Sequence, residues 1–591
     1  MSQTKAQLID AAATFTISSD ASFNSVSIGK GANSVAGNTV LGELALDASV
    51  SGTNNTAIGK SSLSANTSGA SGVAVGAFSL QNNTTGSNNV AVGNSCLDAN
   101  TTGGQNTAVG QDSLGANTEG SSNTAVGKSA LSNNTTASNN SAVGLNALAA
   151  NTTGTQNVAV GATALDANTT GGNNIGVGYN SLGANTTGEH NIAIGSHCLD
   201  VNTTGSRNLG MGVNSLGANT TGSNNVALGE NTLKDNTTGE NITAVGYYAL
   251  EKNTADDNTA IGYYALNANT SGESNVAVGK RALDVNTTGG SNTAIGKNAL
   301  GANTTGTANF AGGTGALESN TTASNNTALG YFALLSNTTG TSNVAVGANA
   351  LDANTTANNN TAIGKNALTT VQTGATNTAV GVQALEDCTG ADNTAVGGFS
   401  GYQITSGTRN SALGYAACGA VTTGTDNVGI GYNGCGQVTT GNGNVGIGRN
   451  TLNTSNTASH NIAIGYTALA STTGGENVAI GREVMVANSS GNNNVGVGSQ
   501  ALKANTTGAE NVALGAFALK SATTGNYNIA IGKDALENVT TGSGNIAVGW
   551  RSLEDCTGGY NTAVGYFAGG NITSGTENVA LGSGTLDANT T

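Results

Sequence analysis

The sequence predicts an all-β protein, a parallel β-solenoid (β-roll) of about 34 coils with a 17-residue repeat. The first observation is a glycine that ends a short apolar motif at 34 places, from Gly29 to Gly582, mostly 17 residues apart. The second is composition: 90 Gly, 0 Pro and only 9% charged residues. The third is the pattern inside each repeat, where β-branched residues alternate with small ones and an Asn-Thr-Thr-Gly turn follows.

A repeat this short favours one coil per repeat, with two short strands and two turns. Each coil is expected to pair with the next through parallel ladders. The lack of Pro agrees, because Pro would remove a hydrogen-bond donor from a ladder. Residues 1–24 do not follow the repeat and are predicted to be an N-terminal cap or anchor segment, and residues 25–591 the repetitive solenoid shaft.

Three columns are predicted to form the core, with positions counted from the glycine of each coil. Position −1 is almost always Val, Ile, Leu or Met, position −3 on the same face of the strand is nearly always β-branched, and position +4 is Leu in 28 coils. Where Gly312 breaks column −1, position −3 holds Phe310, which is expected to fill the vacated core space. The predicted coil core is represented by Ile58, Leu63, Val75, Leu80, Val92, Leu97 and Phe310.

Position −2 is Ala in 27 coils and Gly in five. Side chains alternate along a strand, so this column should point away from column −1. Such small residues indicate that another surface approaches closely. We therefore expect the interface between chains of a trimer at Ala57, Ala74, Ala91, Ala108, Ala125, Ala142 and Ala159. The alternative is a tight contact inside a monomeric solenoid.

Polar and sulfur-containing columns add two expectations. Position +7 is mostly Asn, as at Asn66 and Asn83, and stacked amides are predicted to form a hydrogen-bonded ladder. Six cysteines are too few for a disulfide scaffold and are interpreted as small apolar fillers. Cys418 and Cys435 lie in neighbouring coils, and whether they are bonded stays open.

Segments such as "NNTAIGKSSLSANTSG" and "SFNSVSIGKGANSVAGNTVLG" resemble the head repeats of YadA-like trimeric adhesins and similar repeats of bacteriophage tail fibres. The resemblance covers residues 25–591. It implies a β-roll of which three chains pack side by side. The repeat is longer than the family's common one, and the chain lacks a recognisable signal peptide, stalk or membrane barrel. These departures favour a virion fibre over a bacterial autotransporter.

Charge and residue distribution predict what the chain does not bind. A net charge of −15 argues against nucleic-acid binding, and no apolar run is long enough for membrane insertion. His190, His197 and His460 occupy different columns, so no metal site is predicted. The glycines of "GIGYNG" match the G-x-G-x-x-G nucleotide-binding motif, but a chain with 90 glycines is expected to contain this match by chance. We expect no catalytic residues, no cofactor and no enzymatic activity.

The predicted function is that of a structural fibre or appendage protein of a virion, a tail fibre or similar, which mediates host-surface adhesion. Expected partners are two further copies in a homotrimer, another virion or appendage protein at one or both ends, and a cell-surface glycan. The alternatives are a YadA-like bacterial surface adhesin or extracellular filament subunit and, less favoured, an ice-binding solenoid. Aromatic residues at positions +1 and +2 are the candidate receptor contacts: Tyr247, Tyr248, Tyr263, Tyr264, Tyr331, Phe332, Trp550, Tyr566 and Phe567.

Overall fold

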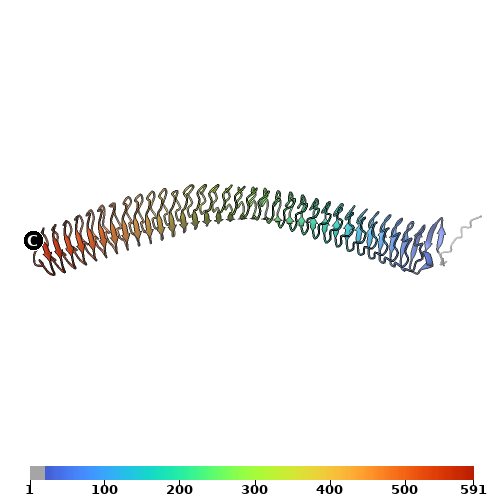
Figure 1. Ribbon diagram of the computed structural model, residues 1–591, viewed down its shortest axis with the longest axis horizontal. Helices are drawn as coiled ribbons and strands as arrows, with labels where there is room; N and C mark the ends of the chain where they lie inside the picture. The colour runs from blue at the N-terminus through green and yellow to red at the C-terminus, as the bar shows by residue number, and fades with distance from the viewer. Residues whose placement is uncertain (1–19, 591) are drawn as a thin grey trace, which may run out of the picture. The chain divides into compact units, whose positions relative to one another are not determined.

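Residues 20–590 are described by a computed structural model, in which each repeat forms one coil of a parallel β-solenoid. The chain divides into two compact units, one ending at Lys280 and the other starting at Arg281. Within each unit the strands of successive coils lie side by side in chain order (Figure 1). The ladders keep register, so that Val158 pairs with Ile175 one coil further on. The predicted fold class is confirmed.

The strands are short, mostly three residues. In the first unit they are β1 (Ala21–Phe23), β2 (Val26–Gly29), β3 (Thr39–Gly42), β4 (Thr56–Ile58), β5 (Val73–Val75), β6 (Val90–Val92), β7 (Thr107–Val109), β8 (Thr124–Val126), β9 (Ser141–Val143), β10 (Val158–Val160), β11 (Ile175–Val177), β12 (Ile192–Ile194), β13 (Leu209–Met211), β14 (Val226–Leu228), β15 (Thr243–Val245), β16 (Thr259–Ile261) and β17 (Val276–Val278). In the second unit they are β18 (Thr293–Ile295), β19 (Phe310–Gly312), β20 (Thr327–Leu329), β21 (Val344–Val346), β22 (Thr361–Ile363), β23 (Thr378–Val380), β24 (Thr394–Val396), β25 (Ser411–Leu413), β26 (Val428–Ile430), β27 (Val445–Ile447), β28 (Ile462–Ile464), β29 (Val478–Ile480), β30 (Val495–Val497), β31 (Val512–Leu514), β32 (Ile529–Ile531), β33 (Ile546–Val548), β34 (Thr562–Val564) and β35 (Val579–Leu581).

Each coil carries one strand, so the prediction of two strands per coil is wrong. Positions −5, +2 and +4 have positive φ, for example 63° at Asn54, 53° at Ser61 and 51° at Leu63. This left-handed backbone cannot continue a strand. The wall opposite the strand still bonds to the next coil, because the amide of Leu63 donates to the carbonyl of Ser79 at 3.0 Å.

The left-handed backbone also explains why column +4 is Leu and not Val or Ile. A β-branched side chain is strongly disfavoured at positive φ. Leu63, Leu80 and Leu97 are buried, as predicted. Where Leu is absent, residues without branching at Cβ replace it, such as Met485 and Cys418, both also buried.

The alanines of column −2 point into their own coil and not toward another chain. Seven of them were predicted at a trimer interface, and all are 0% exposed in the single chain: Ala57, Ala74, Ala91, Ala108, Ala125, Ala142 and Ala159. That prediction is wrong. A surface does approach them closely, but it is the opposite wall of the coil.

Size changes within the interior show how thin it is. At three of the five coils with Gly in column −2, a cysteine sulfur atom occupies the space that an Ala side chain would need. A Cβ on Gly210 would lie 2.5 Å from Sγ of Cys198, and one on Gly429 would lie 2.6 Å from Sγ of Cys418. The inner column therefore varies in size to match the opposite wall, as a packed core requires.

Columns −1 and −3 face outward on the same strands. Ile58 and Val75 are half-buried and Val92 is 37% exposed, so their assignment to the coil core is wrong. Phe310 is also wrongly placed there, because it is 38% exposed. It does share a face with Gly312, since a Cβ on that glycine would lie 3.4 Å from Cε1 of Phe310. The size exchange between the two residues therefore occurs on the outer surface.

Two ladders of buried asparagines run through the interior. In column +7, Nδ2 of Asn134 donates to Oδ1 of Asn117 at 2.8 Å and to the carbonyl of Ala137 at 3.0 Å. This ladder was predicted. Column −4 forms a second one, in which the backbone amide of Asn123 donates to Oδ1 of Asn106 at 3.0 Å. Nδ2 of Asn123 reaches the same Ala137 carbonyl at 2.9 Å, so the two ladders meet at the turn.

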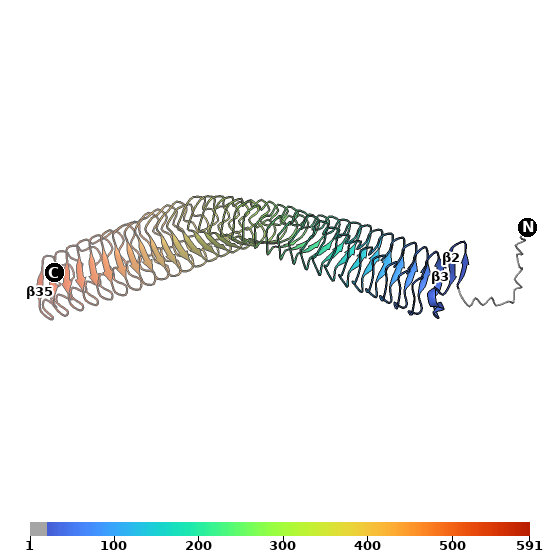
Figure 2. The same cartoon turned by 45° about the vertical axis from the view of Figure 1, so that its right-hand side comes forward.

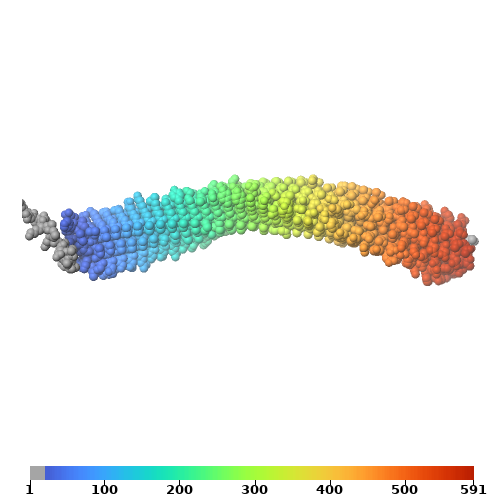
Figure 3. Space-filling model, turned by 180° about the vertical axis from the view of Figure 1, so that it is seen from behind, coloured from blue at the N-terminus to red at the C-terminus, as the bar shows by residue number. Residues whose placement is uncertain are grey.

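The repeated glycine is required by the stacking of the coils. At Gly59 φ is 129°, and an added Cβ would lie 2.5 Å from the carbonyl oxygen of Gly76 in the next coil. Neither the backbone angle nor the space admits a larger residue. Adjacent coils within each unit accordingly contact one another without gaps (Figure 3).

The N-terminal end of the first unit is antiparallel. Strand β1 pairs with β2, and β2 pairs with β3 (Figure 2). The carboxylate of Asp20 accepts hydrogen bonds from the backbone amides of Lys30 and Gly31 at 2.6 and 2.8 Å, and the 3-10 turn η1 (Ala32–Ser34) follows. The predicted boundary between cap and shaft at residue 24 falls inside the β1–β2 hairpin. Most of the predicted cap segment lies outside the described residues.

The second unit contains two variant coils in which glycine replaces the core Leu. Ile404 and Ile572 lie three residues after these glycines, and both are 0% exposed. A Cβ on Gly401 would lie 3.0 Å from Cδ1 of Ile404, and one on Gly569 would lie 2.9 Å from Cδ1 of Ile572. The isoleucines therefore occupy the space beside each glycine.

Candidate functional site

The outer face of the strand stack carries exposed apolar side chains along each unit. Column −1 exposes Val143, Met211 and Leu329 by 40%, 45% and 49%, and the same column continues through each unit. Columns −1 and −3 point away from the coil interior, and no second layer formed by residues 20–590 covers them. A contiguous exposed apolar stripe of this kind is typical of an association surface.

The predicted receptor-contact aromatics lie at the surface, at positions +1 and +2. In column +1, Tyr247, Tyr263, Tyr331, Trp550 and Tyr566 are 40–55% exposed. In column +2, Tyr248, Tyr264, Phe332 and Phe567 are half-buried. Both columns were predicted to contact a receptor. In the structure the rings of column +1 form an exposed outer row, whereas those of column +2 pack against the coil.

Four of these aromatics form a cluster on two successive coils. The rings of Tyr247 and Tyr263 stack at 5.7 Å between centroids, and those of Tyr248 and Tyr264 at 5.2 Å. Nζ of Lys280 lies 5.6 Å from the centroid of the Tyr263 ring. The hydrogen bond with the side chain of Tyr248 raises the pKa of Tyr247 to about 12. Because the rings stack in pairs, part of each ring face is covered by another ring of the cluster.

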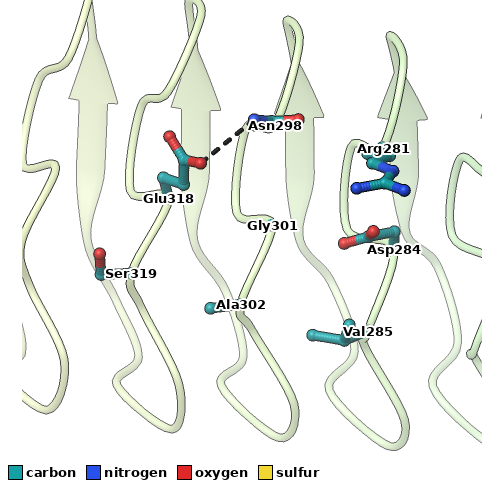
Figure 4. A pocket seen from close by; sticks show the side chains of 8 residues that line it. All are labelled: Arg281, Asp284, Val285, Asn298, Gly301, Ala302, Glu318 and Ser319. Carbon is teal, nitrogen blue, oxygen red and sulfur yellow. Dashed lines mark hydrogen bonds between the residues drawn. The ribbon is translucent and has the colours of Figure 1, made fainter.

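A second kind of feature, absent from the sequence predictions, is a side notch where position +5 is glycine. Gly301 leaves a cavity of about 490 Å³ between the coils on either side (Figure 4). Arg281 and Asp284 come from the preceding coil, Asn298 from the coil of Gly301, and Glu318 from the following one. Nδ2 of Asn298 donates to Oε1 of Glu318 at 3.1 Å, which closes one side.

Two further notches have the same origin but different linings. At Gly217 the cavity is about 370 Å³ and is flanked by Asp200, Lys234 and Asp235. At Gly419 and Gly436 it is about 190 Å³ and carries no charged residue. A sequence signal for the two charged notches exists, because Gly217 and Gly301 each follow an Asp 17 residues earlier.

Several aspartates at position +5 are partly withdrawn from water, including Asp284 of the notch at Gly301. Burial raises the pKa of Asp98, Asp166 and Asp284. For Asp284, the nearby Arg281 guanidinium opposes this shift. Nδ1 of His197 lies 3.0 Å from Oδ2 of Asp200, whereas His190 and His460 are in other coils. No group of three or more His, Cys, Asp or Glu side chains that could hold a metal occurs in residues 20–590.

Thiol and hydroxyl columns are used by the fold itself. All six cysteines are buried and unbonded, including Cys418 and Cys435. Burial raises the pKa of Cys198 to about 12, and the neighbouring Cys418 thiol together with burial raises that of Cys435. In the Thr-Thr turn, Oγ1 of Thr84 donates to the carbonyl of Thr101 at 2.9 Å, so the first hydroxyl is part of a ladder.

Comparison with known proteins gives no family or relative. No protein-family model matches the sequence, and no curated protein matches it either. Across residues 20–590 there is also no helix with the length and apolar character to cross a membrane.

Proposed function

We propose that this protein is a structural fibre subunit of a virion, a tail fibre or similar appendage, that carries host-surface adhesion and has no catalytic role. The observation that carries the proposal is the repetition of one coil through each unit, with the same ladders and the same outer apolar columns. Such an architecture makes a long lateral surface. The resemblance of the repeats to trimeric adhesin heads and phage tail fibres supports the same conclusion.

The fibre is proposed to be a homotrimer in which the outer strand face, columns −1 and −3, packs between chains. This replaces the alanine face, which is buried within the single chain. Support comes from the exposure of large apolar residues such as Met211, Leu329 and Leu413, which are 45–51% exposed. Covering these side chains is favourable because it removes apolar surface from water. The number of three chains comes from the family resemblance.

Charge substitutions on this face test the assembly. Changing Val126, Val143 and Val160 together to Lys should leave the coil folded and convert the trimer to monomers in sedimentation equilibrium. The matched control changes Ser122, Asn139 and Gln156, exposed residues of column −5 in the same coils, to Lys. That column already holds Arg207. A monomeric wild type, or a Val variant that stays trimeric, would contradict the proposal.

Immunogold electron microscopy tests the location. Antibodies against the recombinant chain should label projections of purified virions. Labelling of bacterial surfaces or extracellular filaments in place of virions would favour the alternative adhesin or filament subunit.

A further inference from the structure

The uncharged notch of the second unit differs from the others in its wall. In three successive coils, position +5 holds Tyr402, Gly419 and Gly436. The same position carries Asp, Glu or Lys in other coils, so the backbone accepts a side chain there. The two glycines therefore remove two side chains and leave a hollow of about 190 Å³ beside Tyr402.

The wall of the hollow is aromatic and is held in place. Phe399 and Tyr402 both line it, with their rings edge to face at 5.9 Å between centroids. Phe399 also packs edge to face on Tyr415 at 5.6 Å, and Tyr415 stacks on Tyr432 at 5.5 Å. This chain of ring contacts restrains the wall, so little side-chain freedom would be lost when a ligand binds.

The rest of the lining is made of amides and small residues. Gln403 and Gln437 are exposed, and neither side-chain amide forms a hydrogen bond to another residue within the described part of the chain. Nδ2 of Asn433 donates to Oδ1 of Asn450 at 3.2 Å. Each amide offers both a donor and an acceptor group. No lining residue is charged, in contrast to the notches at Gly217 and Gly301.

We infer that this hollow binds one neutral hexose unit of a glycan. A pyranose ring has an apolar face of C–H groups and a rim of hydroxyl groups. An aromatic wall suits the first, and free amides suit the second. The small volume admits a single ring and not a large ligand. Because the lining is uncharged, an acidic sugar gains no compensating partner there. The inference deepens the proposed adhesive function and rests on it for its biological role.

Saturation-transfer NMR on the full-length chain tests the site with glucose, galactose, mannose and N-acetylglucosamine as probes. We expect at least one of them to bind. Tyr402→Ala removes an aromatic ring from the wall. Gly436→Asn fills the hollow with a side chain that the same position already carries in the next coil, at Asn453. Each change should weaken binding about tenfold or more.

The matched controls are Tyr527→Ala, which removes an exposed aromatic that is not among the candidate receptor contacts, and Gly301→Asn, which fills the charged notch. Both should bind as the wild type does. The inference is overturned if no neutral hexose binds, if both site variants bind normally, or if only sialic acid, added as the acidic comparison, binds. If no neutral hexose binds but antibodies still label virions, the sugar site is refuted and the fibre proposal stands. If a hexose binds but virions are not labelled, the sugar site stands and the virion location is refuted.

Discussion

Adjacent residues of one strand occupy two opposite environments in this protein. Ala125 is 0% exposed and Val126, the next residue, is half-buried on the outer face. The inner column is small because the opposite wall, with its Leu side chains, lies close behind it. The outer column can be large because no other part of the described chain packs on it. In a coil this thin, the size of a residue therefore reflects the space available to it and not how deeply it is buried.

The largest effect should come from a charge on the inner face. Ala125→Arg buries an unpaired cation where there is no room for it, and should destabilise the surrounding coils by about 4 kcal/mol or more. Hydrogen exchange of β7–β9 and thermal unfolding would measure it. The control is Val126→Arg, whose charge lies outside the coil, so the fold of the single chain should lose less than about 1 kcal/mol even where the variant separates the chains of the proposed trimer. Equal losses for the two variants would refute the assignment of the faces.

The asparagine ladder should give the next largest effect. Asn134→Leu leaves Oδ1 of Asn117 and one N–H of the Asn151 side-chain amide without their partners, at a cost of about 2–3 kcal/mol. Asn133 is exposed and precedes it in the same turn, so Asn133→Leu is the matched control and should be nearly neutral. Chemical denaturation of the two variants compares them. The ladder adds nothing to stability if they unfold together.

The left-handed Leu column should show a smaller effect that depends on side-chain shape. Leu131 has φ of 55° and is buried. Leu131→Ile keeps the volume but places a β-branched residue in the left-handed region, which should cost about 1–2 kcal/mol. Leu131→Met should cost less, because Met485 already occupies this column. The melting temperatures of both variants decide the matter, and Ile tolerated as well as Met would argue against backbone strain.

The smallest effect is expected at the outer surface. Phe310→Thr removes a ring that covers Gly312 but is itself 38% exposed, so unfolding should become easier by less than about 1 kcal/mol. Adding Gly312→Val should recover that loss, because Thr and Val then stand as in β8. Thermal melts of the single and double variants provide the test. If Phe310→Thr lowered the free energy of unfolding by several kcal/mol, Phe310 would have to be part of the core.

Much of the fold could be predicted from local pattern. The period, the burial of Leu63, the asparagine ladder through Asn66 and Asn83 and the filling role of Ile404 all follow from residues that repeat or compensate in the sequence. The second ladder through Asn106 and the notch at Gly436 were not predicted. Both depend on contacts between residues in different turns, which a column of letters does not place in space.

The repeat pattern alone shows that each strand has two unlike faces, one of Ala and one of β-branched residues. It could not determine which of them points inward, because both columns are apolar and strand alternation treats them symmetrically. Only the tertiary structure decided this. The left-handed turns at positions such as Leu131 bring the opposite wall so close that Ala fits between the walls and Val does not.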